Sequence, residues 1–229
     1  MKKSTKTKVY NLNIIILGYK DTGKTKLINS IVEPNKKTDK YNPTIGAELK
    51  YGLVETKINN KNIRIKIKFM EISGQSRFKS IISPKIVMKG DIIIFVYKSN
   101  DEKSFDKLRN IYINCFDYDK PKPLNFLLCN KVDINNSEEN IKLKEDVLEF
   151  CDENNIIFHH CTNFLENCSN VNNSSYYNDR TNVFKNLLKE IIIPTYFKKK
   201  GIIPDEHKKG IIPEEENEDL MPEEEKLEI

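Results

Sequence analysis

Residues 14–25 read Ile-Ile-Ile-Leu-Gly-Tyr-Lys-Asp-Thr-Gly-Lys-Thr, an apolar run that passes directly into a glycine-rich turn. The part from Gly18 to Thr25 matches the pattern Gly-x4-Gly-Lys-[Ser/Thr]. In this pattern, backbone N–H groups wrap phosphate oxygens at the positive N-terminus of the following helix. The apolar residues before the loop predict a buried strand over 9–17, and those after it predict a helix over 24–32. This order predicts a nucleotide-binding α/β protein.

Strands and helices alternate along the rest of the chain. Apolar and charged residues alternate over 61–69, which predicts a half-exposed strand that pairs antiparallel with 48–58 through a turn at Asn59-Asn60. Buried strands are predicted over 91–97, 124–129 and 156–160, and helices over 102–115, 139–153 and 181–193. We therefore expect a doubly wound α/β fold, with a six-stranded, mostly parallel sheet, one antiparallel edge strand and helices on both faces.

The 229 residues are enough for one domain and a tail. We expect a basic extension over 1–8, a domain over 9–197 with an Asn/Ser-rich insertion at 164–180, and a charged, disordered tail over 198–229. The tail carries six basic and eleven acidic residues, which leaves +9 on residues 1–197. Within it, Lys-Lys-Gly-Ile-Ile-Pro-Asp-Glu at 199–206 recurs with one change at 208–215.

Composition excludes several classes of protein. Five cysteines without paired spacing indicate reduced thiols in the cytoplasm, and no apolar run is long enough to cross a bilayer. Only four of the 38 basic residues are Arg, and the Lys residues are scattered. This pattern is typical of a solvated surface, so we expect no nucleic-acid partner.

A second motif, Cys129-Asn130-Lys131-Val132-Asp133, follows the predicted strand 124–129. Ligands of open α/β sheets bind beyond the carboxyl ends of the strands, so this loop is expected to face the same crevice as the phosphate loop. The Asp133 carboxylate can accept two hydrogen bonds from the donor edge of guanine, which adenine lacks. The motif therefore predicts selectivity for guanine nucleotides.

With both motifs in this order, the sequence resembles the Ras superfamily of small GTPases, and its Rab branch most closely, from Val9 to Ile193 outside the insertion. Tyr41-Asn42-Pro43-Thr44-Ile45-Gly46 resembles the first switch, and Ile72-Ser73-Gly74-Gln75-Ser76-Arg77-Phe78 the second. The resemblance implies a switch that binds GTP or GDP with Mg²⁺, hydrolyses GTP and serves vesicle traffic.

The resemblance also implies roles for individual residues. Gln75 would orient the attacking water, and Lys24 would contact the β- and γ-phosphates. Thr25 and Thr44 would bind Mg²⁺ directly, and Glu71 would do so through a water molecule. The nucleotide would be held by Gly18, Asp21, Thr22, Gly23, Lys24, Thr25, Lys26, Thr44, Gly74, Asn130, Lys131, Asp133, Cys161, Thr162 and Asn163.

Several residues depart from the family pattern. Glu71 stands where the family has Asp, and Asp21 brings negative charge close to the phosphates. Lys20 adds bulk where an arginine finger from a partner would enter. Such an arginine accelerates hydrolysis by a factor of about 10³–10⁵. We therefore expect slow hydrolysis. A GTPase-like interaction scaffold with weak or no hydrolysis stays open as an alternative, as does a nucleoside or metabolite kinase.

Partner binding is expected through the two switches. By the resemblance, an exchange factor, a GTPase-activating protein and effectors would contact residues 38–50 and 71–85. The last cysteine is Cys168 and residue 2 is Lys2, so neither prenylation nor myristoylation is expected. Any membrane association is expected to be indirect, through a partner.

Overall fold

The computed structural model describes residues 8–34, 43–58, 61–75, 82–99, 101–116, 122–130, 138–161 and 183–203. The strands are β1 (Lys8–Leu17), β2 (Ala47–Ile58), β3 (Lys61–Ile72), β4 (Ile92–Lys98), β5 (Leu124–Asn130) and β6 (Ile157–Cys161). The helices are α1 (Lys24–Val32), α2 (Pro84–Val87), α3 (Glu102–Cys115), α4 (Glu138–Asn154), α5 (Val183–Leu187) and α6 (Ile193–Lys199). Every strand and helix expected from the sequence is present, and the short α2 was not predicted.

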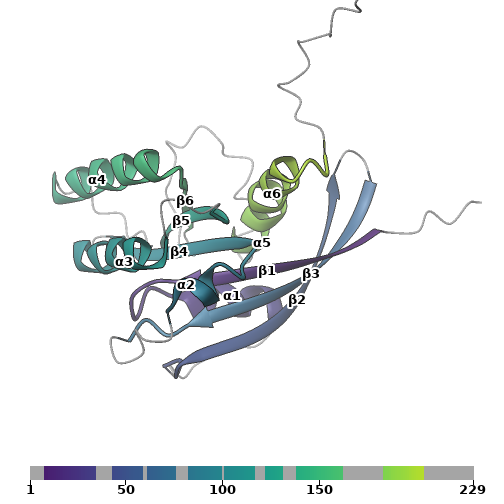
Figure 1. Cartoon of the computed structure of the whole chain (residues 1–229), viewed down its shortest axis with the longest axis horizontal. Coiled ribbons are helices and arrows are strands. Elements are labelled where there is room, and N and C mark those ends of the chain that lie inside the picture. Colours follow the sequence, from purple (N-terminus) through teal and green to yellow (C-terminus); the bar gives the residue numbers. More distant parts are fainter. Residues whose placement is uncertain are drawn as a thin grey trace, which may run out of the picture.

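The six strands form one sheet in the order β2-β3-β1-β4-β5-β6 (Figure 1). Only the edge strand β2 runs antiparallel to its neighbour, β3, and the other four pairs are parallel. The expected fold class is thereby confirmed, including its antiparallel edge. The predicted turn at Asn59-Asn60 lies outside the described residues.

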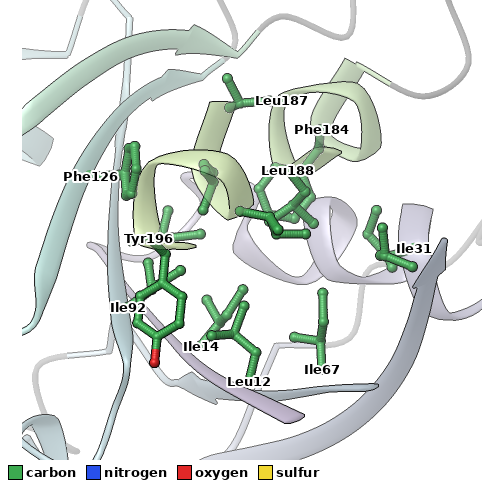
Figure 2. Packing of buried hydrophobic residues seen from close by; sticks show 14 of the residues in the cluster. Leu12, Ile14, Ile31, Ile67, Ile92, Phe126, Phe184, Leu187, Leu188 and Tyr196 are labelled. Carbon is green, nitrogen blue, oxygen red and sulfur yellow. The ribbon is translucent and has the colours of Figure 1, made fainter. Parts of the chain in front are cut away.

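Helices cover both faces of the sheet because the buried strands are apolar on both sides. In one core cluster, Leu12 and Ile14 of β1 pack with α1 and with the C-terminal helices, as Figure 2 shows. In the other, Ile15 and Leu17 pack with α2, α3 and α4. Adjacent residues of β1 thus enter opposite clusters, as the alternation of side chains in a strand requires.

The C-terminal helical segment differs from its prediction over 181–193. After α5, a π-helical turn spans Leu188–Ile192, and α6 then continues to Lys199. The predicted helix stops at residue 193, directly before Pro194. Proline cannot donate a hydrogen bond to the carbonyl of the preceding turn, but Pro194 occupies the first turn of α6, directly after the wider π turn, where the helical hydrogen-bond pattern changes.

Two contacts fix α6 on the sheet. Tyr196 donates a hydrogen bond of 3.0 Å to Asp91 Oδ1, and the Phe197 ring lies 4.8 Å from the Tyr10 ring of β1, centroid to centroid. The predicted insertion at 164–180 and the tail beyond residue 203 lie outside the described residues. No helix in the described part of the chain combines the length and apolar character needed to cross a membrane.

Candidate functional site

The loop between β1 and α1 has a backbone that only certain residues allow. A Cβ atom at Gly18 would lie 2.2 Å from the carbonyl oxygen of Val96, so β4 approaches too closely for any side chain there. Gly23 has a φ of 91° and Asp21 a φ of 61°, a left-handed conformation that costs little for glycine and is tolerated by aspartate. The loop therefore turns sharply onto the start of α1.

The N-terminus of α1 is left without a side-chain cap. Within the described residues, Gly23 supplies no cap hydrogen bond, and the first turn of α1 holds no acidic residue. In α3, by contrast, the Asp101 carboxylate accepts a hydrogen bond of 3.1 Å from the backbone N–H of Ser104. The uncapped N–H groups of α1 and its positive dipole end form an anion-binding site of the kind that phosphates occupy.

Lys24 places a buried cation at this same position. Its Nζ donates to the carbonyl oxygens of Gly18 at 3.0 Å and Tyr19 at 2.8 Å. Burial lowers the pKa of Lys24 to about 8, although the negative charges of Glu71 and Asp21 act in the opposite direction. A buried ammonium group that is costly to keep charged gains strongly from an added anion.

Three oxygen atoms from distant parts of the chain meet beside the loop. The Thr25 hydroxyl donates a hydrogen bond of 2.6 Å to Glu71 Oε1, and the Thr44 hydroxyl donates to the same oxygen at 3.1 Å. The two hydroxyl oxygens are 3.3 Å apart. Glu71 was predicted to act through a water molecule, and here its longer side chain contacts both hydroxyls directly.

This oxygen cluster fits a divalent cation. Glu71 is 1% exposed, and its second oxygen, Oε2, is buried with no hydrogen-bond partner among the described residues. A buried carboxylate oxygen without a partner is unfavourable unless a cation neutralises it. Hydroxyl and carboxylate oxygens are the ligands that Mg²⁺ prefers, so Thr25, Thr44 and Glu71 form a donor set suited to it.

The segment after β3 packs directly on the phosphate loop. A Cβ atom at Gly74 would lie 2.3 Å from the carbonyl carbon of Tyr19 and 2.4 Å from the carbonyl oxygen of Gly18. Gln75 Nε2 lies 3.5 Å from the carbonyl oxygen of Thr44. The two regions that resemble the switches thus contact each other and the loop, with Gly74 the point of closest approach.

Asn130 has a contact that sequence reasoning missed. This buried side chain donates a hydrogen bond of 2.6 Å from Nδ2 to the carbonyl oxygen of Thr22. It therefore ties the end of β5 to the phosphate loop across 108 positions of sequence. The only signal in the sequence is that an amide side chain stands where the buried strand 124–129 ends.

The other predicted residues are brought together only in part. Cys161 ends β6 beside Asn130 in the register of the sheet, and Lys26 is exposed on α1. Lys131, Asp133, Thr162 and Asn163 lie outside the described residues. The proposed base-recognition loops nevertheless leave two neighbouring strands at the same edge, where parallel strands present ligand sites.

Comparison with known proteins gives consistent matches. The model of the Ras family matches residues 13–189. "Ras-related protein RABG3b" of Arabidopsis thaliana is 33% identical over 152 residues, which cover 64% of this chain and 72% of the relative. "Ypt/Rab-type GTPase ypt7" of Schizosaccharomyces pombe is 32% identical over 151 residues, 63% of this chain and 69% of the relative. "Ras-related protein Rab7" of Glycine max is 31% identical over 144 residues, which cover 61% of this chain and 67% of the relative.

Proposed function

This chain belongs to the Ras family, and the relatives it resembles are Rab-type proteins. We therefore propose that it is a guanine-nucleotide switch that hydrolyses GTP slowly. The observation that carries the proposal is the meeting of Thr25, Thr44 and Glu71. These residues come from the phosphate loop and from both switch regions. A cation bound to them would hold the two switches against the nucleotide, which is how order in these loops senses the γ-phosphate.

The chain's own groups have distinct roles in hydrolysis. Lys24 and the N–H groups at the start of α1 neutralise charge that develops on the phosphates. Gln75, which lies beside Thr44, orients the water for in-line attack on the γ-phosphate. Bound Mg²⁺ would neutralise phosphate oxygens and would be held by Thr25, Thr44 and Glu71.

Slow turnover follows from the departures in the loop and the second switch. Asp21 and Lys20 are both exposed at the loop, where one adds negative charge and the other adds bulk in the path of a partner's arginine. Glu71 uses its Oε1 on two hydroxyls at once, an arrangement that differs from a carboxylate acting through water. A single-turnover rate equal to that of an ordinary Rab protein would contradict this part of the proposal.

Selectivity for guanine is assigned to Asp133, with Asn130 and Lys131 completing the loop. The position of Asn130 supports this assignment, because it joins the strand that leads to Asp133 directly to the phosphate loop. Cys161, Thr162 and Asn163 are proposed to meet the base from the neighbouring strand, where a backbone N–H can serve the guanine oxygen.

The decisive experiment measures affinity for GTP and for ATP, each with and without Mg²⁺. We expect strong preference for GTP, an increase in affinity with Mg²⁺, and loss of base preference in Asp133→Ala. Preference for ATP would favour the kinase alternative. Nucleotide extracted from the purified protein separates the remaining two: a mixture of GDP and GTP supports the switch, and an empty site supports a scaffold without useful hydrolysis.

We also propose a cellular role, which the similarity to Rab-type relatives supports. We place the protein in the cytoplasm and in vesicle traffic, where an exchange factor, a GTPase-activating protein and effectors would bind residues 38–50 and 71–85. Its recruitment to endomembranes would depend on one of these partners. Binding of an effector that requires GTP, and is lost with GDP, would support this role.

A further inference from the structure

Among the described residues, nothing covers one face of the β2–β3 hairpin, although this face is partly apolar. Six of its side chains, which we call the outer hairpin face, are Leu49, Tyr51 and Leu53 of β2 and Arg64, Lys66 and Lys68 of β3. The three apolar side chains are 46%, 67% and 53% exposed. None of the six residues belongs to either core cluster, whereas the opposite side of the same strands packs against α1 and the π-helical turn Leu188–Ile192.

The face combines an apolar row with a basic row. In the register of the sheet, Tyr51 lies opposite Lys68, and Leu53 lies opposite Lys66. Arg64 pairs with Glu55 at 2.7 Å, but no ion pair is found for Lys66 or Lys68 within the described residues. Apolar patches rimmed by charge mark interaction sites, and this one fits a segment that carries both apolar and acidic residues.

The chain itself contains a segment with that chemistry. Residues 204–229 hold eleven acidic and three basic residues. Within them, Glu-Glu-Glu-Asn-Glu-Asp at 214–219 is flanked by the apolar pairs Ile211-Ile212 and Leu220-Met221, with one proline between. The outer hairpin face and this segment are complementary in charge. The face carries exposed apolar side chains, and the segment carries the two apolar pairs.

The tail also starts within reach of the face. Phe197 of α6 packs on Tyr10, and the next residue of β1, Val9, points to the outer side and lies opposite Arg64 in the register. The seven residues 204–210, which join the described chain to residue 211, can span up to about 25 Å when extended. This is more than half the length of β2, which at 12 residues is about 40 Å long.

From these observations we propose that residues 211–221 dock on the outer hairpin face of the same molecule. The acidic residues 214–219 lie against Lys66 and Lys68, and the apolar pairs cover Tyr51 and Leu53. The hairpin connects the two switch regions, since β2 begins three residues after Thr44 and β3 contains Glu71. A partner that binds this hairpin must therefore displace the tail first. This proposal does not depend on which nucleotide the protein binds.

Zero-length carbodiimide cross-linking of the full chain tests the proposal, because it joins only lysines and carboxylates in contact. We expect Lys66 and Lys68 to cross-link to residues 214–219 several-fold more than do Lys103 and Lys144, two exposed lysines on α3 and α4 that serve as internal controls. Equal yields at all four lysines, or no product at Lys66 and Lys68, would overturn the proposal.

Two variants remove apolar contacts while keeping every cross-linking group. Ile211→Ser combined with Ile212→Ser, or Leu53→Ser alone, is expected to reduce the product at Lys66 and Lys68 several-fold. The matched control is Ile113→Ser on α3, because Leu53 and Ile113 are similarly exposed, at 53% and 56%. If Leu53→Ser changes the yield no more than Ile113→Ser, the apolar row is not part of the docking site and the proposal fails.

A mixture of ¹⁴N- and ¹⁵N-labelled protein separates docking within one molecule from docking between copies. Mass spectrometry is expected to find products in which both peptides carry the same label, at a yield that does not change with protein concentration. Mixed-label products would show that the tail reaches a second copy, and would overturn docking within the molecule.

Discussion

The Thr25 hydroxyl donates a 2.6 Å hydrogen bond to Glu71 Oε1, joining the start of α1 to the end of β3. Because the Thr44 hydroxyl donates to the same oxygen, this one carboxylate connects the phosphate loop with both switch regions. Its other oxygen is buried without a partner among the described residues. Glu71 is therefore the residue through which loss of a cation is expected to loosen both switches together.

We predict that Glu71→Gln, which keeps the shape and removes the charge, raises the Mg²⁺ concentration needed to retain nucleotide by about tenfold or more, the loss of about 1.4 kcal/mol. The measurement is the release rate of a fluorescent GDP analogue over a Mg²⁺ titration. Glu48→Gln is the control, because Glu48 is exposed and pairs only with Lys50, at 3.4 Å, among the described residues. Unchanged Mg²⁺ dependence in Glu71→Gln would remove Glu71 from the proposed cation site.

Gly74→Ala is predicted to separate nucleotide binding from hydrolysis. The added Cβ would stand 2.3 Å from the carbonyl carbon of Tyr19, so the second switch must move away from the loop and take Gln75 with it. We expect GDP affinity within about threefold of wild type and a fall of at least about tenfold in single-turnover GTP hydrolysis, a loss of about 1.4 kcal/mol or more.

Gly201→Ala is the matched control for this change. Gly201 also lacks a side chain, but nothing lies within 4 Å of its Cβ position, and only its φ of +65° opposes substitution. It should lower the free energy of unfolding slightly and leave hydrolysis unchanged. Normal hydrolysis in Gly74→Ala would mean that this close approach is not needed for the reaction.

The fold was predictable because its signals are local. The apolar run 12–17 and the alternation at 61–69 predict strands that need no knowledge of their neighbours, and the helix over 24–32 matches α1 residue for residue. The exception is the C-terminal helical segment, which was predicted only over 181–193, whereas α6 continues through Pro194 to Lys199. The sequence patterns did not predict the π turn that precedes α6, whose Leu188 and Ile192 are buried in the core.

The site was predictable only as a set of motifs. Thr25 and Glu71 are 46 positions apart, and Asn130 and Thr22 are 108 apart, so no spacing rule could show that their side chains meet. The geometry of Glu71 depends on one extra methylene within a packed interior, which sequence patterns do not resolve. Family resemblance supplied roles, while contacts between distant segments required the structure.

Asn130→Ala is predicted to weaken nucleotide binding through the loop rather than through the base. Losing the 2.6 Å bond to the Thr22 carbonyl leaves a buried acceptor without its partner, at a cost of about 1–3 kcal/mol. We expect GDP and GTP affinity to fall together, about tenfold or more, as measured by equilibrium titration.

Asn125→Ala is the control, since Asn125 is buried in the same strand but its Oδ1 has no hydrogen-bond partner within the described residues. It should change nucleotide affinity little. Equal losses in the two variants would attribute the effect to general damage to β5.

The pKa of Lys24 predicts a pH dependence that can be isolated from other groups. Its pKa is about 8 in the folded protein and about 10.4 in the unfolded chain. Between these values the folded state binds fewer protons than the unfolded state, so the free energy of unfolding rises with pH. The stability that wild type gains when Lys24 deprotonates is complete above about pH 10.4. This stability is lost as the pH falls through about 8, because Lys24 is then charged in the folded protein too.

Buried thiols oppose this trend, because burial raises the pKa of Cys115 to about 11 and of Cys151 to about 12. The measurement is therefore a difference between wild type and Lys24→Met, both free of nucleotide, from urea unfolding at pH 7, 8, 9 and 10. Lys24→Met is expected to be the more stable at pH 7, because it lacks the cost of a buried cation. Above pH 8 the free energy of unfolding of wild type should rise relative to that of Lys24→Met, by up to about 1.4 kcal/mol per pH unit. A difference that stays constant from pH 7 to 10 would mean that Lys24 keeps an ordinary pKa, and that its burial does not favour phosphate binding.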